Sequence, residues 1–235
     1  MDNLISLLQE SPGAIAVVVV LITAIVLYIQ SSRPPIALSQ DFQAFTLSQK
    51  EVLSHDTRRF TFAFPNPKSE LGLPVGQHMT LMFEDEDGKH HQRSYTPVSH
   101  SIGRVSFVIK IYMAGVNPKF PNGGKVSQHL ESLKIGDSMM MKGPKGHLHW
   151  LGRGKFTIKK PKKALETRHA KEIGMIAGGT GITPMLQILH AIFQDSGDTT
   201  CCKLLYANQS TYQLTDVCNL FFVLVGANII VNMFS

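Results

Sequence analysis

The spacing of apolar residues divides the chain into regions that predict different structures. From about residue 43 to 142 the apolar runs are short, and residues 59–64 alternate so that three phenylalanines share one face. Segments 78–83 and 105–112 are further candidate strands, and clusters of Gly, Pro, Asn and Asp separate them. This pattern predicts an antiparallel β-barrel or sandwich, with a short helix at 126–133.

The pattern changes after a charged stretch at 155–168. Residues 173–177 form a short apolar run, a glycine-rich turn follows at 178–181, and Pro184 begins a helical pattern that continues to about Phe193. A second strand is expected at 203–207. Strand, helix and strand in this order predict one βαβ unit of a nucleotide-binding sheet.

The N-terminal region carries the longest apolar run. Residues 14–29 are uncharged, and as a helix they would extend about 24 Å. A cleaved signal peptide would have a basic leader, but Asp2 and Glu10 are the charged residues before the run. We therefore expect an uncleaved, single-pass membrane anchor. Arg33 follows it, which favours a cytosolic body, and a proline-containing stalk is expected at 31–40.

Composition narrows the class of protein. The formal charge is +6 and the calculated pI is about 9.2, but the basic residues look scattered, so we expect no nucleic-acid partner. The three cysteines have no metal-ligand spacing, which favours a reducing compartment. His147 and His149 are interpreted as a polar edge strand, and no metal site is expected.

Three motifs carry candidate chemistry. Residues 93–97, RSYTP, place an arginine and a tyrosine on one side of a strand, where a guanidinium fork would suit phosphate oxygens. Residues 123–127, GGKVS, lead into a helix start whose N–H groups would suit phosphate. Residues 178–184, GGTGITP, join a strand to a helix but lack the G-x-G-x-x-G spacing. Taken singly, the first motif is also compatible with a surface arginine beside a core tyrosine, and the second with a plain turn capped by Ser127.

Taken in order, these motifs resemble the NADH–cytochrome b5 reductase family of the ferredoxin-reductase superfamily. The resemblance rests on RSYTP at 93–97, VIKIY at 108–112, NPKFP at 117–121, GGKVS at 123–127, GMIAGGTGITPM at 174–185 and LLYANQ at 204–209. It covers about residues 52–209. Ser94, Val126 and His129 depart from the residues most frequent in the family.

The resemblance implies an antiparallel β-barrel that binds FAD, followed by an incomplete α/β domain that binds NADH. It divides the chain into a membrane anchor (1–30), a stalk (31–40), the FAD-binding barrel (41–152), a linker (153–170), a partial NADH-binding domain (171–209) and a divergent apolar tail (210–235).

The resemblance also assigns residue roles. Thr96 and Lys110 are the implied catalytic residues, with Lys110 near the nicotinamide. Cofactor contacts are implied for Arg93, Ser94, Tyr95, Thr96, Val108, Lys110, Met113, Gly124, Lys125, Val126, Ser127, Gly179, Thr180, Thr183 and Pro184.

The implied reaction is electron transfer from NADH through FAD to cytochrome b5 or a similar haem acceptor, on the endoplasmic reticulum or the outer mitochondrial membrane. The tail lacks the family's further βα units. It is either a divergent segment that completes the fold or, as we favour, a foreign tail. The alternative function is a membrane-tethered FAD-binding module without reductase activity.

Overall fold

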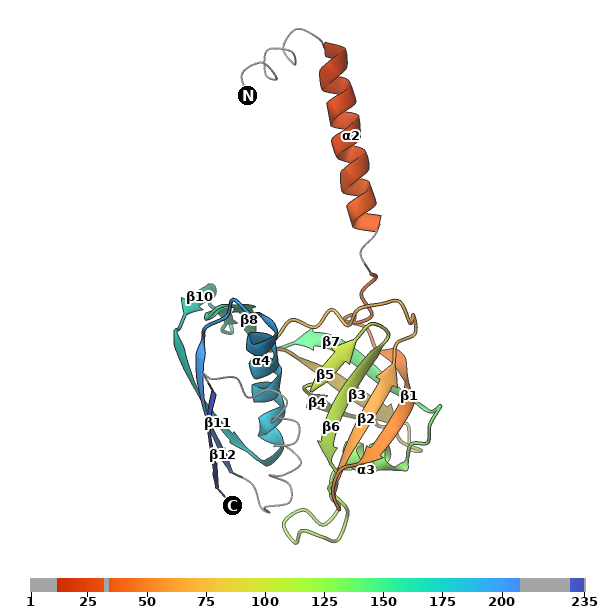
Figure 1. Ribbon diagram of the computed structural model, residues 1–235. Helices are drawn as coiled ribbons and strands as arrows, with labels where there is room; N and C mark the ends of the chain where they lie inside the picture. The colour runs from red at the N-terminus through yellow and green to blue at the C-terminus, as the bar shows by residue number, and fades with distance from the viewer. Residues whose placement is uncertain (1–11, 32–33, 208–228, 235) are drawn as a thin grey trace. The chain divides into compact units, whose positions relative to one another are not determined.

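The computed structural model describes residues 12–31, 34–207 and 229–234 (Figure 1). The chain forms two compact units, Met1–Pro35 and Ile36–Ser235. The described part of the first unit is the helix α2, Pro12–Ser31.

Helix α2 contains no charged residue. Its apolar side chains are exposed all round, for example Val20 and Ile22 at 65% and 56%. Within the described ranges, however, no helix is long and apolar enough to cross a membrane. The membrane span expected over residues 1–30 is therefore not confirmed.

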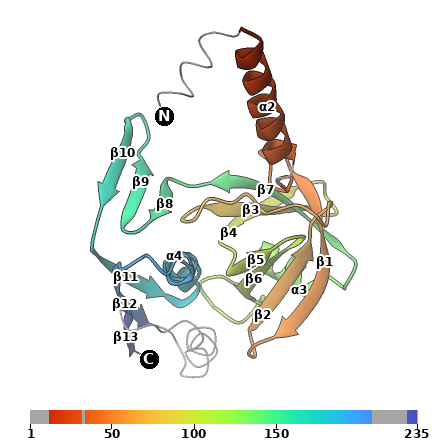
Figure 2. The ribbon, with the colours of Figure 1, turned by 45° about the horizontal axis from the view of Figure 1, so that its top comes forward.

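The second unit begins with a seven-stranded antiparallel sheet, as the sequence predicts. Its strand order is β4-β3-β7-β1-β2-β6-β5, and Figure 2 shows the sheet curling around its core. We call residues 36–145 the barrel region. It contains the helix α3 (Lys125–Ser132), which packs against β3 and β4, and the strands β1 (Gln43–Val52), β2 (Thr57–Ala63), β3 (His78–Glu84), β4 (His90–Tyr95), β5 (Ser99–Ser101), β6 (Arg104–Lys110) and β7 (Ser138–Lys145).

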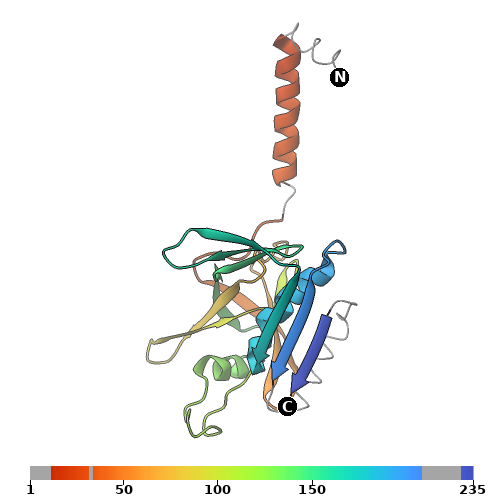
Figure 3. The ribbon, with the colours of Figure 1, turned by 90° about the vertical axis from the view of Figure 1, so that its left-hand side faces the viewer.

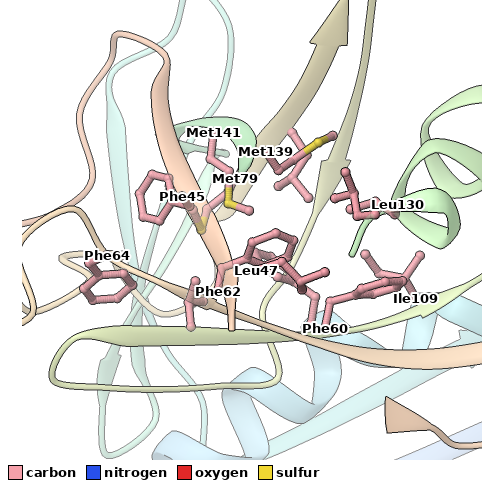
Figure 4. Close-up of a cluster of buried hydrophobic side chains, with 14 of the residues drawn as sticks. Phe45, Leu47, Phe60, Phe62, Phe64, Met79, Ile109, Leu130, Met139 and Met141 are labelled. Atoms are coloured by element: carbon pink, nitrogen blue, oxygen red, sulfur yellow. The ribbon is translucent and has the colours of Figure 1, made fainter. Parts of the chain in front are cut away.

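The barrel core confirms the alternation in residues 59–64. Phe60 and Phe62 are completely buried and Phe64 nearly so. Phe62 packs edge-to-face on Phe107 of β6, with ring centroids 6.2 Å apart. Figure 4 shows this cluster, to which Met79, Met139 and Met141 contribute from β3 and β7. An antiparallel sheet with one buried face accounts for the period of two.

Residues 36–40, which we call the N-terminal arm, belong to the second unit although the sequence suggested a stalk. Ala37 and Leu38 are buried in the barrel core, and their N–H groups donate to the carbonyls of Glu70 (2.8 Å) and Leu71 (3.2 Å). The apolar Ala37 and Leu38 after the two prolines explain the difference, because their side chains join the core.

A second sheet occupies most of the segment expected as a linker. Strands β8 (Leu148–Gly152), β9 (Lys155–Lys159) and β10 (Leu165–His169) form a three-stranded antiparallel sheet. Within β9, Phe156 and Ile158 alternate with polar residues, and Phe156 stacks on Trp150 with centroids 6.0 Å apart. The high lysine content hides this alternation in the sequence.

The α/β region follows as predicted. Strand β11 (Glu172–Gly178), the 3-10 turn η1 (Gly179–Gly181), helix α4 (Ile182–Gln194) and strand β12 (Cys201–Ala207) form a βαβ unit whose strands pair in parallel. Strand β13 (Ile229–Phe234) pairs in parallel with β12. This strand lies in the predicted tail, so the alternative in which the tail adds to the fold agrees with the pairing.

The barrel and α/β regions are joined by specific contacts within the second unit. Gln187 of α4 accepts a hydrogen bond from the Gly76 N–H (2.7 Å) and donates one to the Gln77 carbonyl (3.2 Å). The Trp150 N–H donates to the Val75 carbonyl at 2.8 Å. Val98, which follows β4, is buried in the same apolar cluster as α4.

Candidate functional site

The end of β4 presents Arg93 and Tyr95 from alternate positions of one strand, which pair with Leu81 and Met79 of β3. Arg93 is exposed, and its Nη1 donates to the Gln92 carbonyl at 2.9 Å. Tyr95 is half-buried against the barrel core. Burial, partly opposed by Arg93, raises the pKa of Tyr95 to about 12. The phenol therefore stays protonated at neutral pH and can donate a hydrogen bond.

The residues beside this pair differ in exposure. Ser94 is exposed and pairs with Thr80 in the β3–β4 ladder. Thr96 is partly buried at the point where the chain leaves the strand. Two residues later Val98 enters the α4 cluster, so Thr96 lies next to the junction between the barrel and α/β regions.

The end of β6 brings Val108 to the same junction and pairs Lys110 with an acidic side chain. Val108 packs against the α4 cluster. The Lys110 ammonium lies 2.9 Å from Asp56 Oδ2, and both side chains are largely buried, with 19% and 17% of their surface exposed. The positive charge of Lys110 is thus paired with Asp56, a residue that the sequence analysis did not include.

Helix α3 begins in a turn that its glycine pair makes possible. Gly123 has φ +60°, and a Cβ there would collide with the Tyr112 carbonyl. The Gly124 N–H donates to that carbonyl at 2.8 Å. The buried Ser127 hydroxyl donates to the Gly124 carbonyl (2.9 Å) and accepts from the Tyr112 N–H (3.1 Å). Ser127 therefore holds the helix start against the segment after β6.

The exposed residues around this turn are the ones available to a ligand. Lys125 is exposed at the first position of α3, Val126 is buried beneath it, and Met113 is 51% exposed. Gly124 is the N-cap with extended backbone, and no side chain caps the helix. A helix N-terminus of this kind favours an anionic group.

The glycine turn before α4 leaves its surface open. Gly179 has φ +50°. A Cβ on Gly178, Gly179 or Gly181 would meet no heavy atom within 4 Å among the described residues. Thr183 Oγ1 donates to the Thr180 carbonyl at 3.3 Å. Pro184 stands in the first turn of α4, where no N–H donor is needed.

The structure thus brings together four of the predicted segments. The end of β6 is bonded to the start of α3 through Tyr112, and Val98 and Val108 pack on α4. Lys110 differs from the other predicted site residues because its ammonium is paired with Asp56. A separate groove of about 310 Å³ over β11 and β12 contains none of the predicted site residues.

Comparisons with known proteins match this arrangement. Residues 44–150 match the family model of the oxidoreductase FAD-binding domain, and residues 175–220 match that of the oxidoreductase NAD-binding domain. The chain is 46% identical over 203 residues to NADH-cytochrome b5 reductase 2 of Xenopus laevis, covering 84% of this chain and 68% of that protein. The chain belongs to the NADH–cytochrome b5 reductase family. The predicted cofactors, FAD and NADH, are confirmed as those of the family's two domains.

Other members and a solved structure agree. NADH-cytochrome b5 reductase 3 of Rattus norvegicus is 50% identical over 186 residues, 77% of this chain and 62% of the rat protein. The chain thus spans about three fifths of the length of that relative. The cytochrome b5 reductase domain of Ulva prolifera nitrate reductase superposes with a TM-score of 0.74 at 35% identity, covering 84% of this chain and 75% of that domain.

Proposed function

We propose that the chain is a flavoprotein oxidoreductase that transfers a hydride from NADH to FAD and then single electrons to cytochrome b5 or a similar haem protein. One observation carries the proposal: the two cofactor-domain families occur in order within one compact unit. Val108, one of the predicted site residues, packs on the α4 cluster between them. Bound flavin supplies the link between two-electron and one-electron chemistry.

The groups around β4 and α3 fit a dinucleotide with a pyrophosphate. The exposed Arg93 guanidinium offers a planar fork, and the uncapped start of α3 at Gly124, Lys125 and Val126 offers N–H groups and a positive charge. The hydroxyl of Ser127 is used within the chain, so we assign this residue to holding the turn rather than to direct charge neutralisation.

The groups at the junction fit a flat ring system. Tyr95 offers an aromatic face and a protonated hydroxyl, Thr96 offers a hydroxyl, and Val108 excludes water from one side. We assign Met113 to the exposed rim of this site. We assign Lys110 a positioning role, because its pair with Asp56 fixes the end of β6.

The open turn before α4 fits the nicotinamide nucleotide. Gly179 and its glycine neighbours permit close approach of a ligand to the backbone. Thr180, Thr183 and Pro184 line the start of the helix, which favours a phosphate or a carboxamide oxygen.

A spectroscopic experiment tests this assignment. The full chain, purified in detergent and incubated with FAD, should show a bound flavin spectrum that bleaches when NADH is added without oxygen. Oxidised cytochrome b5 added afterwards should become reduced, which haem absorbance reports. Flavin that binds but is not bleached would contradict hydride transfer and leave a flavin-binding module, and failure to bind flavin would contradict the proposal as a whole.

Matched arginine variants sharpen the test. Arg93→Ala should weaken FAD binding by about tenfold to a hundredfold, because a charge-assisted hydrogen bond contributes about 1.5–3 kcal/mol. Arg104→Ala is the control, since Arg104 is also exposed but is not a predicted site residue and bonds to Ser101. Equal effects of the two changes would count against the role of Arg93.

We also propose that α2 tethers the chain to a membrane of the endoplasmic reticulum or the outer mitochondrial membrane. A helix that is apolar all round needs a covering phase, and its side chains are exposed in the structure. The full chain should float with neutral phosphatidylcholine vesicles in a density gradient. A chain that stays at the bottom of the gradient would exclude the tether.

A further inference from the structure

Although the basic residues look scattered along the whole sequence, those between residues 145 and 171 gather in or next to the β8–β10 sheet. Residues 145–171 contain nine lysines and arginines and one acidic residue, a net charge of +8, whereas the whole chain carries +6. The remainder of the chain is therefore slightly acidic, at −2. The nine are Lys145, Arg153, Lys155, Lys159, Lys160, Lys162, Lys163, Arg168 and Lys171.

The register of this sheet separates a buried face from a basic face. Trp150 and Phe156 pair across β8 and β9 and pack in the α4 cluster. Alternate residues point the other way, which places Lys155 and Lys159 of β9 together with Leu165 of β10 on the outer face. We call this outer face, with the β9–β10 turn at 160–164, the basic face.

The lysines of the basic face are not used to stabilise the fold. Lys155, Lys159, Lys162 and Lys163 are exposed and form no ion pair with any residue that the structure describes. Glu166 is the acidic residue of the sheet, and it is shared by Lys160 and Arg168 at 3.6 Å and 2.7 Å. Among these charges, Leu165 is 62% exposed.

The N-terminal arm is bonded to the end of β7, from which the chain continues to the β8–β10 sheet. The Gln40 side chain donates to the Pro144 carbonyl at 3.1 Å, and the Gly143 N–H donates to the Ser39 carbonyl at 2.8 Å. Residues 143–144 lie within β7, and residues 146–147 connect β7 to β8. Figures 1 and 3 show the arm and the β8–β10 sheet at the same end of the second unit and α3 at the opposite end.

We infer that the basic face binds an anionic lipid surface. This inference rests on the proposed tether, because four residues separate the end of α2 from Ile36 and so keep the arm's end of the unit near any membrane that holds α2. Lysines near a phosphatidylserine-containing leaflet each add to binding, and an exposed leucine among them suits the boundary between headgroups and acyl chains. Docking through this face leaves the opposite end, with α3 and the proposed flavin site, away from the lipid.

Two triple variants of the full chain test the inference at equal net charge. The first is K159Q/K162Q/K163Q on the basic face. The matched control is K68Q/K89Q/K134Q, three exposed lysines elsewhere in the barrel region without described ion pairs. Because all six side chains are exposed, both variants should keep the urea midpoint of the unchanged chain.

The measured quantity is the preference for anionic over neutral vesicles at limiting lipid. Flotation with vesicles of phosphatidylcholine alone reports the tether, and flotation with vesicles one-third phosphatidylserine reports the tether and the basic face together. At about 0.15 M salt the first variant should lose about tenfold to a hundredfold in this preference, whereas the control should stay within about twofold. The preference should vanish at about 1 M salt.

The outcomes separate the inference from the proposals on which it rests. Flotation with neutral vesicles but no anionic preference would overturn the basic face while leaving the tether intact. Equal losses in the two variants would overturn it as well. If the first variant keeps its lipid preference but loses binding to an acidic haem protein, the face serves a protein partner and the inference is wrong. None of these readouts depends on bound flavin.

Discussion

The barrel and α/β regions bury their apolar side chains in different ways. In the barrel region strands such as β6 and β7 bury every second residue in the core, and Phe60, Phe62 and Phe107 are completely buried. In the α/β region one face of β11 and β12 packs on α4, while Ile176 and Leu205 on the other face are 77% and 40% exposed. Parallel strands are apolar on both faces because both are normally covered. The difference indicates that the barrel region is the stable scaffold and the α/β region the weaker partner.

The largest expected effect comes from removing one core side chain in each region. Phe62→Ala should cost about 3–5 kcal/mol and Leu189→Ala about 2–5 kcal/mol, since both side chains are completely buried. Trp150, the single tryptophan, lies in the α4 cluster and reports the α/β region. Urea unfolding followed by its fluorescence and by flavin release would compare the two regions.

The two variants should differ in which unfolding signals they shift, and this difference tests whether the barrel region is the scaffold. Phe62→Ala should shift both signals, because the α/β region depends on the scaffold. Leu189→Ala should shift the tryptophan signal and leave flavin release within about 0.5 kcal/mol. Equal shifts of both signals by Leu189→Ala would mean that the unit unfolds as one.

Removing a contact between the barrel and α/β regions should have a smaller effect on stability. Gln187→Ala removes both side-chain bonds to the loop before β3 and leaves the half-buried Gly76 N–H without its acceptor. We expect a loss of about 1–3 kcal/mol and a wider separation of the two unfolding signals. Gln194→Ala, at the exposed end of the same helix, is the control and should change stability by less than about 0.5 kcal/mol.

Acid should weaken the barrel region through a stacked histidine. His129 of α3 lies parallel to Phe83 with ring centroids 3.9 Å apart, and burial, partly opposed by Asp137, lowers the pKa of His129 below 6.5. The unfolded chain then binds more protons than the folded chain. This contribution is fully present above about pH 6.5 and is lost as the pH falls through that value towards the folded pKa.

Replacing the imidazole of His129 isolates its contribution to the pH dependence of stability. His129→Phe keeps an aromatic ring on Phe83 and should reduce the loss of stability between pH 7 and pH 5 by a fraction of a kcal/mol. Unfolding midpoints across that range measure it. His169→Phe, an exposed site on β10, is the matched control, and identical profiles for the two variants would refute the role of the stack.

The smallest effect is expected on the open face of the α/β region. Ile176→Thr should change the free energy of unfolding by less than about 0.5 kcal/mol, because the side chain is 77% exposed. The same substitution at Ile188, which is buried against the sheet, should cost well over 1 kcal/mol. A large loss from Ile176→Thr would show that this face is covered in solution.

The sequence pattern predicted the elements in which charged residues do not mask the alternation of apolar side chains. The three phenylalanines of residues 59–64 and the Gly-rich turn before α4 led directly to the observed strands and helix. The β9 strand was missed because Lys155 and Lys159 drew attention to charge, although Phe156 and Ile158 between them show a period of two. Ala37 and Leu38 were missed because the prolines before them suggested a stalk.

The sequence predicted the segments of the candidate site but not the ion pair and hydrogen bonds within it. The motifs located Arg93, Tyr95 and the glycine turns. The pairing of Lys110 with Asp56 joins residues 54 positions apart through the β2–β6 ladder, so no local pattern contains it. The use of the Ser127 hydroxyl within the chain likewise depends on Tyr112 arriving from another element.

The N-terminal arm gives the second unit a mechanical property. Traction applied from the N-terminal side would reach Ala37 and Leu38 first, whose side chains are buried in the barrel core and whose N–H groups are bonded to the strand-like segment at Glu70 and Leu71. The load would fall on the barrel core and not on α4 or its sheet. A pull along the chain would therefore be resisted before it disturbed the junction where the two cofactor-domain families meet.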